Sequence, residues 1–140
     1  MRTIKFKAKK QDNGQWIIGD LVHSIDGKLN ILGFVEVDGI LCFTGKYPIC
    51  PGTVCLFSGL FDKNGKEIYD GDILAHNGRV VGHVVGGVRG YCFDVVYANP
   101  VSTSTWSLYG VVVNDYKGDV EVVGSIYDPE WQKKLNIKTE

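Results

Sequence analysis

Tight-turn dipeptides recur along this chain, and they constrain its fold more than any other feature. Asn-Gly or Asp-Gly occurs at Asn13-Gly14, Asp26-Gly27, Asp38-Gly39, Asn64-Gly65, Asp70-Gly71 and Asn77-Gly78. Both central residues of a type I′ hairpin turn need positive φ, which Asn, Asp and Gly adopt at the lowest cost. The segments between these turns are rich in Val, Ile, Phe, Tyr and Trp. Short strands joined by such turns predict an all-β sandwich or barrel.

The amino-terminal part of the chain predicts a meander of hairpins. Apolar Ile4, Phe6 and Ala8 alternate there with Lys5, Lys7 and Lys9. Strand residues alternate between the two faces of a sheet, so the lysines share one face. That face is either a phosphate-binding stripe or a solvated strand surface, and the solvated surface is the simpler interpretation. Pro48 and Pro51 then predict an irregular link, and we expect residues 1–56 to form the meander and this linking segment.

Residues 57–140 predict a second, compact β domain that ends in a helix. Five strands are expected at residues 73–76, 79–85, 91–97, 108–113 and 120–125. Asp128 is a fair N-cap, Pro129 suits the first helical position, and Glu130 complements the helix dipole. A helix over 129–135 would place Trp131 and Leu135 on one face.

The overall composition excludes several classes of function. The net charge is −1, which argues against tight nonspecific binding to nucleic acid or to an anionic membrane. No apolar run reaches the ~18–20 residues of a membrane span, and the amino end lacks a signal-peptide core. We therefore expect the protein to be cytoplasmic. The cysteines contain no C-x-x-C pair, so reduced thiols are expected and a zinc site is not.

The acidic, glycine-rich stretch from Phe57 to Leu74 is the strongest candidate for chemistry. An EF-hand loop starting at Asp62 needs glycine at its sixth position and glutamate at its twelfth, and the chain has neither. Asp70 and Asp72 could form an acid–base pair, but a flanking glycine turn favours local hydrogen bonds to backbone N–H groups. The stretch therefore predicts a structural latch at the start of the second domain.

The glycine, histidine and serine residues elsewhere in the chain also lack the spacing of known binding or catalytic motifs. The glycines at 82, 86, 87 and 90 match neither a dinucleotide fingerprint nor a P-loop, and no helix follows them. His76 and His83 flank the Asn77-Gly78 turn, and counting outward from that turn places His83 beyond the end of its partner strand. No G-x-S-x-G elbow surrounds Ser58. We therefore expect no catalytic residue, metal or cofactor.

The central stretch resembles the signature of YopX-like proteins of phages and prophages. Ser58-Gly59-Leu60, Asp62 to Tyr69 and Gly71-Asp72-Ile73 follow the approximate pattern T-G-L-x-D-x-N-G-x-E-I-Y-E-G-D-I. Ile4 to Ala8 and Val122 to Glu130 resemble the two ends of the family pattern. The motif residues expected to be structural are Gly59, Leu60, Asp62, Asn64, Gly65, Ile68, Tyr69, Gly71, Asp72 and Ile73.

The resemblance implies an SH3-like small barrel within residues 57–140 and a phage or prophage origin in a bacterial host cell. It implies no mechanism and transfers no catalytic residue. We expect a noncatalytic accessory protein that is a protein-interaction module, forms homo-oligomers and binds a host or phage protein. The alternative is a small-barrel nucleic-acid-binding protein, suggested by Arg2, Lys5, Lys7, Lys9, Lys10, Arg79 and Arg89. Either the lysine-bearing first strand or the polar loop at 99–105 could be a binding surface.

Overall fold

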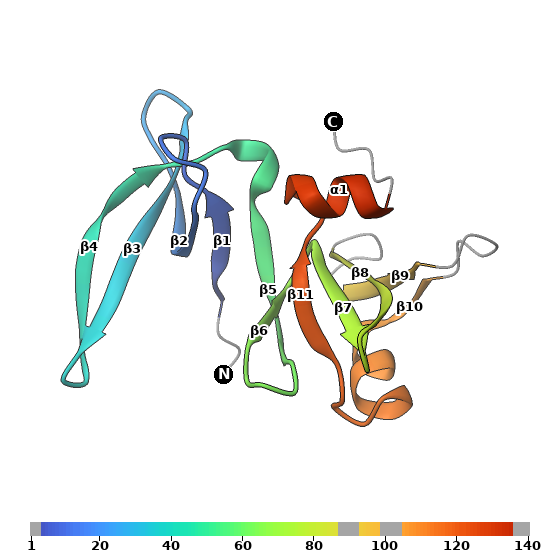
Figure 1. Ribbon diagram of the computed structural model, residues 1–140. Coiled ribbons are helices and arrows are strands. Elements are labelled where there is room, and N and C mark those ends of the chain that lie inside the picture. The colour runs from blue at the N-terminus through green and yellow to red at the C-terminus, as the bar shows by residue number, and fades with distance from the viewer. Residues whose placement is uncertain (1–3, 87–92, 99–104, 136–140) are drawn as a thin grey trace. The chain divides into compact units, whose positions relative to one another are not determined.

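A computed structural model describes residues 4–86, 93–98 and 105–135 (Figure 1). Its strands are β1 (Phe6–Lys9), β2 (Trp16–His23), β3 (Leu29–Val37), β4 (Ile40–Pro48), β5 (Cys55–Phe61), β6 (Glu67–Tyr69), β7 (Asp72–His76), β8 (Arg79–Gly86), β9 (Phe93–Tyr97), β10 (Thr105–Ser107) and β11 (Glu121–Ser125). The helical segments are the 3-10 turn η1 (Pro51–Thr53), the π-helix η2 (Gly110–Asp115) and the α-helix α1 (Pro129–Leu135). The expected all-β class with one short carboxy-terminal α-helix is confirmed.

The chain divides into two compact units, Met1–Phe57 and Ser58–Glu140. In the first unit the antiparallel strand order is β4-β3-β2-β1-β5. Its small core consists of Ala8, Ile31 and Ile49, with Phe6 and Ile17 among the side chains packed against it. The alternation expected for β1 therefore holds at Phe6 and Ala8, whereas Ile4 is exposed. Pro48, which we expected in an irregular link, is the last residue of β4.

The second unit contains an antiparallel sheet with the order β10-β9-β8-β7-β11, and β6 pairs with β5. Its core is formed by Ile68, Leu74, Val81, Val84, Val95, Leu108, Val111, Val112 and Val120. Because β10 and β11 are the two edges of this sheet, the described strands form no closed barrel. The SH3-like topology of this unit stays a prediction.

The strand expected at residues 108–113 is wrong. Leu108 begins a helical segment that continues into η2, and the strand in this part of the chain is the shorter β10. Leu108, Val111 and Val112 are buried, and their spacing of three and four residues is that of one helical face. The β-branched residues favoured a strand by propensity, but packing of this face against the core overrides that preference.

Helix α1 begins and ends at the residues predicted for it. The Trp131 indole lies so close to Gly124 of β11 that a Cβ atom at that position would collide with it. This contact joins α1 to the sheet and requires glycine at that site. The side chain of Leu135, the glycine-rich turn after Gly86 and most of the loop at 99–105 lie outside the described residues. Among the residues described, none of the helices has the length and apolar character that a membrane crossing requires.

Candidate functional site

The residues of the central motif lie on three strands and on the turns that join them. Gly59 and Leu60 lie on β5, Ile68 and Tyr69 on β6, Asp72 and Ile73 on β7, Asp62, Asn64 and Gly65 in the first turn, and Gly71 in the second. Ile68 and Ile73 are fully buried, and Leu60 packs against the core of the second unit. The motif therefore supplies apolar anchors from each of its strands.

Asp62 holds the first turn and also joins it to a distant strand. Its Oδ1 accepts hydrogen bonds from the backbone N–H groups of Asn64 at 2.9 Å and Lys66 at 2.8 Å. Its Oδ2 accepts the N–H of Val122 in β11 at 3.0 Å. Only 7% of Asp62 is exposed. A carboxylate whose two oxygens bind three backbone donors serves as a structural link, in agreement with the proposed latch.

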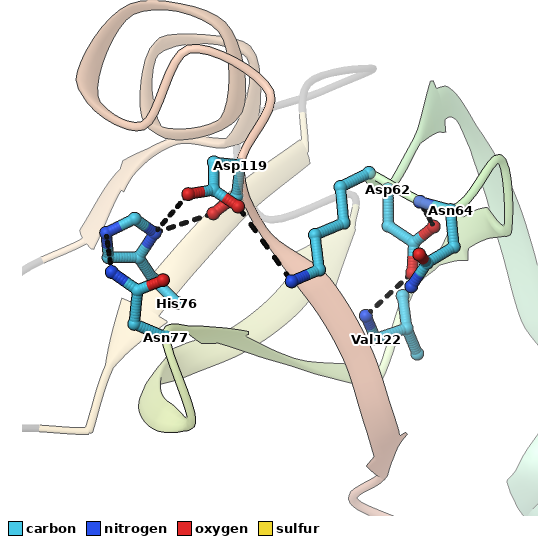
Figure 2. Close-up of polar contacts among 7 residues, drawn as sticks. Asp62, Asn64, His76, Asn77, Asp119 and Val122 are labelled. Atoms are coloured by element: carbon cyan, nitrogen blue, oxygen red, sulfur yellow. Dashed lines mark hydrogen bonds and ion pairs between the residues drawn. The ribbon is translucent and has the colours of Figure 1, made fainter.

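A polar cluster lies beside this link, as Figure 2 shows. The backbone N–H of Lys63 donates to the carbonyl oxygen of Val120 at 2.8 Å, and the Lys63 ammonium lies 3.9 Å from the Asp119 carboxylate. Nδ1 of His76 lies 2.6 Å from the Asp119 carbonyl oxygen, so this nitrogen carries the proton and donates it. The other ring nitrogen of His76 lies 3.2 Å from the side-chain nitrogen of Asn77. These partly exposed contacts fasten the motif and β7 to the segment that leads into β11.

The second turn is a corner built from Asp70, Gly71 and Asp72. Gly71 has a φ of +87°, and a Cβ atom there would lie 3.0 Å from the Tyr127 ring. Asp72 is fully buried and accepts the Tyr69 N–H at 2.8 Å, while Asp70 accepts the Gly86 N–H at 3.1 Å. Burial raises the pKa of Asp70, the Gly86 bond opposes the rise, and the Asp72 charge adds to it. Both carboxylates thus bind backbone donors, as the sequence predicted.

The two histidines of the β7–β8 hairpin do not face each other. His76 pairs with Arg79 beside the turn, whereas His83 pairs with Ile73. The expectation that His83 lies beyond its partner strand is wrong, because β7 begins at Asp72 and a bulge shifts the register. Burial lowers the pKa of His83. Within the described residues, no group of three or more His, Cys, Asp and Glu residues could hold a metal ion.

The lysines of the first strand lie over aromatic rings. The Lys7 and Lys9 ammonium groups are 4.8 and 5.4 Å from the Trp16 ring centre. Lys5 lies 5.4 Å from the ring of Phe57, and Lys10 lies 4.8 Å from the ring of Tyr47. At such distances cation and ring attract each other. The lysine face is thus more structured than the solvated strand surface that the sequence suggested.

The largest departure from expectation is an exposed apolar ribbon, which we define as residues 34–43 of the β3–β4 hairpin. Pairing of β2 with β3 stops at Gly33, so among the described strands only β3 and β4 form the ribbon (Figure 1). Its exposed side chains are Phe34 (37%), Val35 (47%), Val37 (51%), Ile40 (66%), Leu41 (67%) and Phe43 (60%). A two-stranded ribbon cannot bury such side chains by itself.

Both faces of the ribbon are apolar. The cross-strand pairs Val35–Cys42 and Val37–Ile40 lie on one face, and Phe34–Phe43 and Glu36–Leu41 lie on the other. The Phe34 and Phe43 rings are 5.7 Å apart. The sequence predicted only that these residues belong to the amino-terminal meander of hairpins. The signal that could have revealed them is the run Ile40-Leu41-Cys42-Phe43, which lacks the polar alternation of a strand with one solvated face.

These features define the class of protein: an antiparallel β protein of two units, with a structural motif in the second and an apolar ribbon in the first. The model of the YopX protein family matches residues 5–130. The chain therefore belongs to the YopX family, which confirms the resemblance. The comparison with curated proteins found no similar sequence.

Proposed function

We propose that this YopX-family chain is a noncatalytic accessory protein of a phage or prophage that acts as a protein-interaction module through the apolar ribbon. The supporting observation is the exposure of Phe34, Leu41 and Phe43 on one face and of Val37 and Ile40 on the other. A contiguous exposed apolar surface of this kind is more often a protein interface than a sheet surface that remains in contact with solvent.

The free energy gained by burying the exposed side chains of the ribbon is comparable to the cost of association, as expected for a reversible interface. Six side chains that are 37–67% exposed would each regain about half of the ~1.5–3 kcal/mol that full burial contributes. The sum is roughly 4–9 kcal/mol. Association costs about 4–15 kcal/mol, so affinity also requires hydrogen bonds or further contacts.

The test compares two double variants that add the same charge. Leu41→Lys with Phe43→Lys places two lysines on the ribbon, and Ile4→Lys with Ile25→Lys places two at exposed isoleucines elsewhere. Light scattering measures self-association, and affinity capture from bacterial lysate identifies other bound proteins. We expect the wild type and the Ile4/Ile25 variant to bind a protein that the ribbon variant loses. Identical behaviour of all three proteins in both measurements would contradict the proposal.

A second candidate, nucleic-acid binding, is favoured by the lysine–aromatic face of β1. Basic grooves with aromatic side chains bind single strands by phosphate contacts and base stacking. Here, however, lysines already occupy positions over the rings of Trp16, Tyr47 and Phe57. Of the proposed contact residues, Arg2 and Arg89 lie outside the described part of the chain. A gel-shift experiment at ~50 mM salt, where phosphate contacts are strongest, should show binding that Lys7→Gln weakens, and no shift would eliminate this candidate.

A further inference from the structure

We infer that the partner of the ribbon is a second copy of this chain, joined by antiparallel pairing of β4 with β4 around a two-fold axis at Cys42. This inference rests on the proposed function, because it names a partner for the same ribbon, bound along the β4 edge. β4 is the last strand in the order of its sheet, so one of its sides carries backbone groups that no described strand pairs.

Only half of this edge is protected against pairing. Natural edge strands are blunted by lysine, proline and bulges. Lys46, Pro48 and the bulge at Thr44 and Gly45 serve this role in the second half of β4. Residues 40–43 are Ile, Leu, Cys and Phe, and they contain none of these devices. The structure thus leaves a short apolar segment of edge available for β addition.

The direction of the backbone groups determines which residues can pair. Val37 and Ile40 flank the two-residue turn Asp38-Gly39, whose φ angles are +52° and +78°. In such a hairpin the groups of Ile40 point toward β3, so alternation directs those of Leu41 and Phe43 outward. Leu41 and Phe43 lie on either side of Cys42. A two-fold axis at Cys42 therefore places Leu41 of each subunit opposite Phe43 of the partner subunit. In each of these two symmetry-related pairs, the backbone N–H and C=O groups of the two residues can bond to each other.

Charge complementarity favours this register. Asp38 and Lys46 lie four residues to either side of Cys42, so a two-fold axis at Cys42 directs the turn at Asp38 toward the end of β4 that carries Lys46 in the partner subunit. Moving the axis to Leu41 would shift each Asp38 two positions away from Lys46 of the partner subunit and weaken both opposite-charge attractions. Exposed ion pairs add little affinity, but they discriminate between registers that bury the same apolar residues.

The register also brings two thiols together. Cys42 would face Cys42 of the partner subunit in a non-hydrogen-bonded pair, where Cα atoms lie about 4.5 Å apart. Disulfides form at Cα separations of about 4.4–6.8 Å. The Cys42 thiol is exposed, whereas Cys50 is half-buried and Cys55 is buried. Diamide, which accepts the two electrons and two protons released by a pair of thiols, can therefore test the register in the full-length protein.

The decisive experiment combines light scattering at roughly 100 μM protein with diamide cross-linking, since a micromolar interface is populated at that concentration. We expect a dimer that cross-links efficiently, a loss of at least tenfold in cross-linking with Cys42→Ser, and no loss with Cys50→Ser. In the Cys42→Ser background, Leu41→Cys chains should cross-link with Phe43→Cys chains when mixed, and neither should do so alone.

The possible results separate this inference from the proposed function. A wild type that is monomeric and does not cross-link through Cys42 would overturn the β4 pairing. If the Leu41→Lys/Phe43→Lys variant still lost a captured protein that the Ile4→Lys/Ile25→Lys variant retains, the ribbon would remain an interface, for a different partner. A dimer that survives the two lysines on the ribbon would also overturn the inference, because its interface would lie elsewhere.

Discussion

Replacement of Asp62 by alanine should destabilise the second unit more than an ordinary turn substitution does. The carboxylate accepts three backbone N–H groups, and one of them belongs to Val122, sixty positions further along the chain. Asn64 and Lys66 are exposed, so water can replace Asp62 at their N–H groups. Val122 itself is only partly exposed and lies within β11, so its N–H cannot be solvated as easily.

Hydrogen bonds to charged groups contribute about 1.5–3 kcal/mol each. Because water can solvate the two turn donors in the variant, we expect the free energy of unfolding to fall by about 2–4 kcal/mol. For a chain of this size, that loss corresponds to a melting temperature lower by about 5–15 °C. Urea unfolding should show a lower midpoint with an unchanged m-value, because the compactness of the two states does not change. Hydrogen exchange should become faster at the Val122 amide.

The first unit offers a matched control. Asp26 accepts the Lys28 N–H at 3.1 Å in the Asp-Gly turn between β2 and β3, and both residues are exposed. Asp26→Ala therefore removes a local turn bond without a link to a distant strand, and we expect a loss below about 1 kcal/mol. Equal midpoints for Asp62→Ala and Asp26→Ala would refute the reasoning that the bond to Val122 makes Asp62 a latch.

Three further predictions concern the second unit. Gly71→Val should unfold or aggregate the protein, since φ is +87° and the Tyr127 ring leaves no room, whereas Gly27→Val, at φ +83° with open space, should remain soluble on gel filtration. Trp131→Ala should lower the melting temperature by several degrees through a loss of about 2–3 kcal/mol of burial, and an unchanged midpoint would show that α1 is not docked. Because the pKa of His83 is lowered in the folded state, the unfolded state binds more protons below pH 6.5, and the free energy of unfolding should fall as the pH drops from 6.5 toward the lowered pKa. The difference between the urea midpoints at neutral and acidic pH should therefore be smaller in His83→Gln than in the wild type. An equal difference in the two proteins would contradict this.

Turn chemistry made much of the fold predictable. Positive φ angles occur at Asp38 and Gly39 and again at Asn77 and Gly78. Each of these two dipeptides forms the turn of a β-hairpin, as the sequence predicted. The helix over 129–135 could be predicted because Asp128, Pro129 and Glu130 are local start signals that need no tertiary partner. Local chemistry of this kind is decided within a few residues, so one sequence suffices to recognise it.

Features that depend on distant residues could not be predicted. The segment from Leu108 to Val113 is rich in valine, and only its packing against the core selects the helical face. The bond from Asp62 to Val122 requires the fold itself to bring β11 to the turn. The ribbon was missed for the same reason. Leu41 and Phe43 have the composition of core residues, and their exposure follows from where β2 stops, for which the missing polar alternation of residues 40–43 is the only local hint.

The latch at Asp62 has a consequence for the order in which the protein forms during synthesis. The paired strands of the first unit lie within Met1–Phe57, so their contacts are available once β5 leaves the ribosome. The second unit must wait for Val120 and Val122, which bind Lys63 and Asp62. Domains fold as units while the chain grows. The ribbon can therefore form before the second unit closes, and if the proposed pairing of two copies is correct, it can begin while both chains are still being translated.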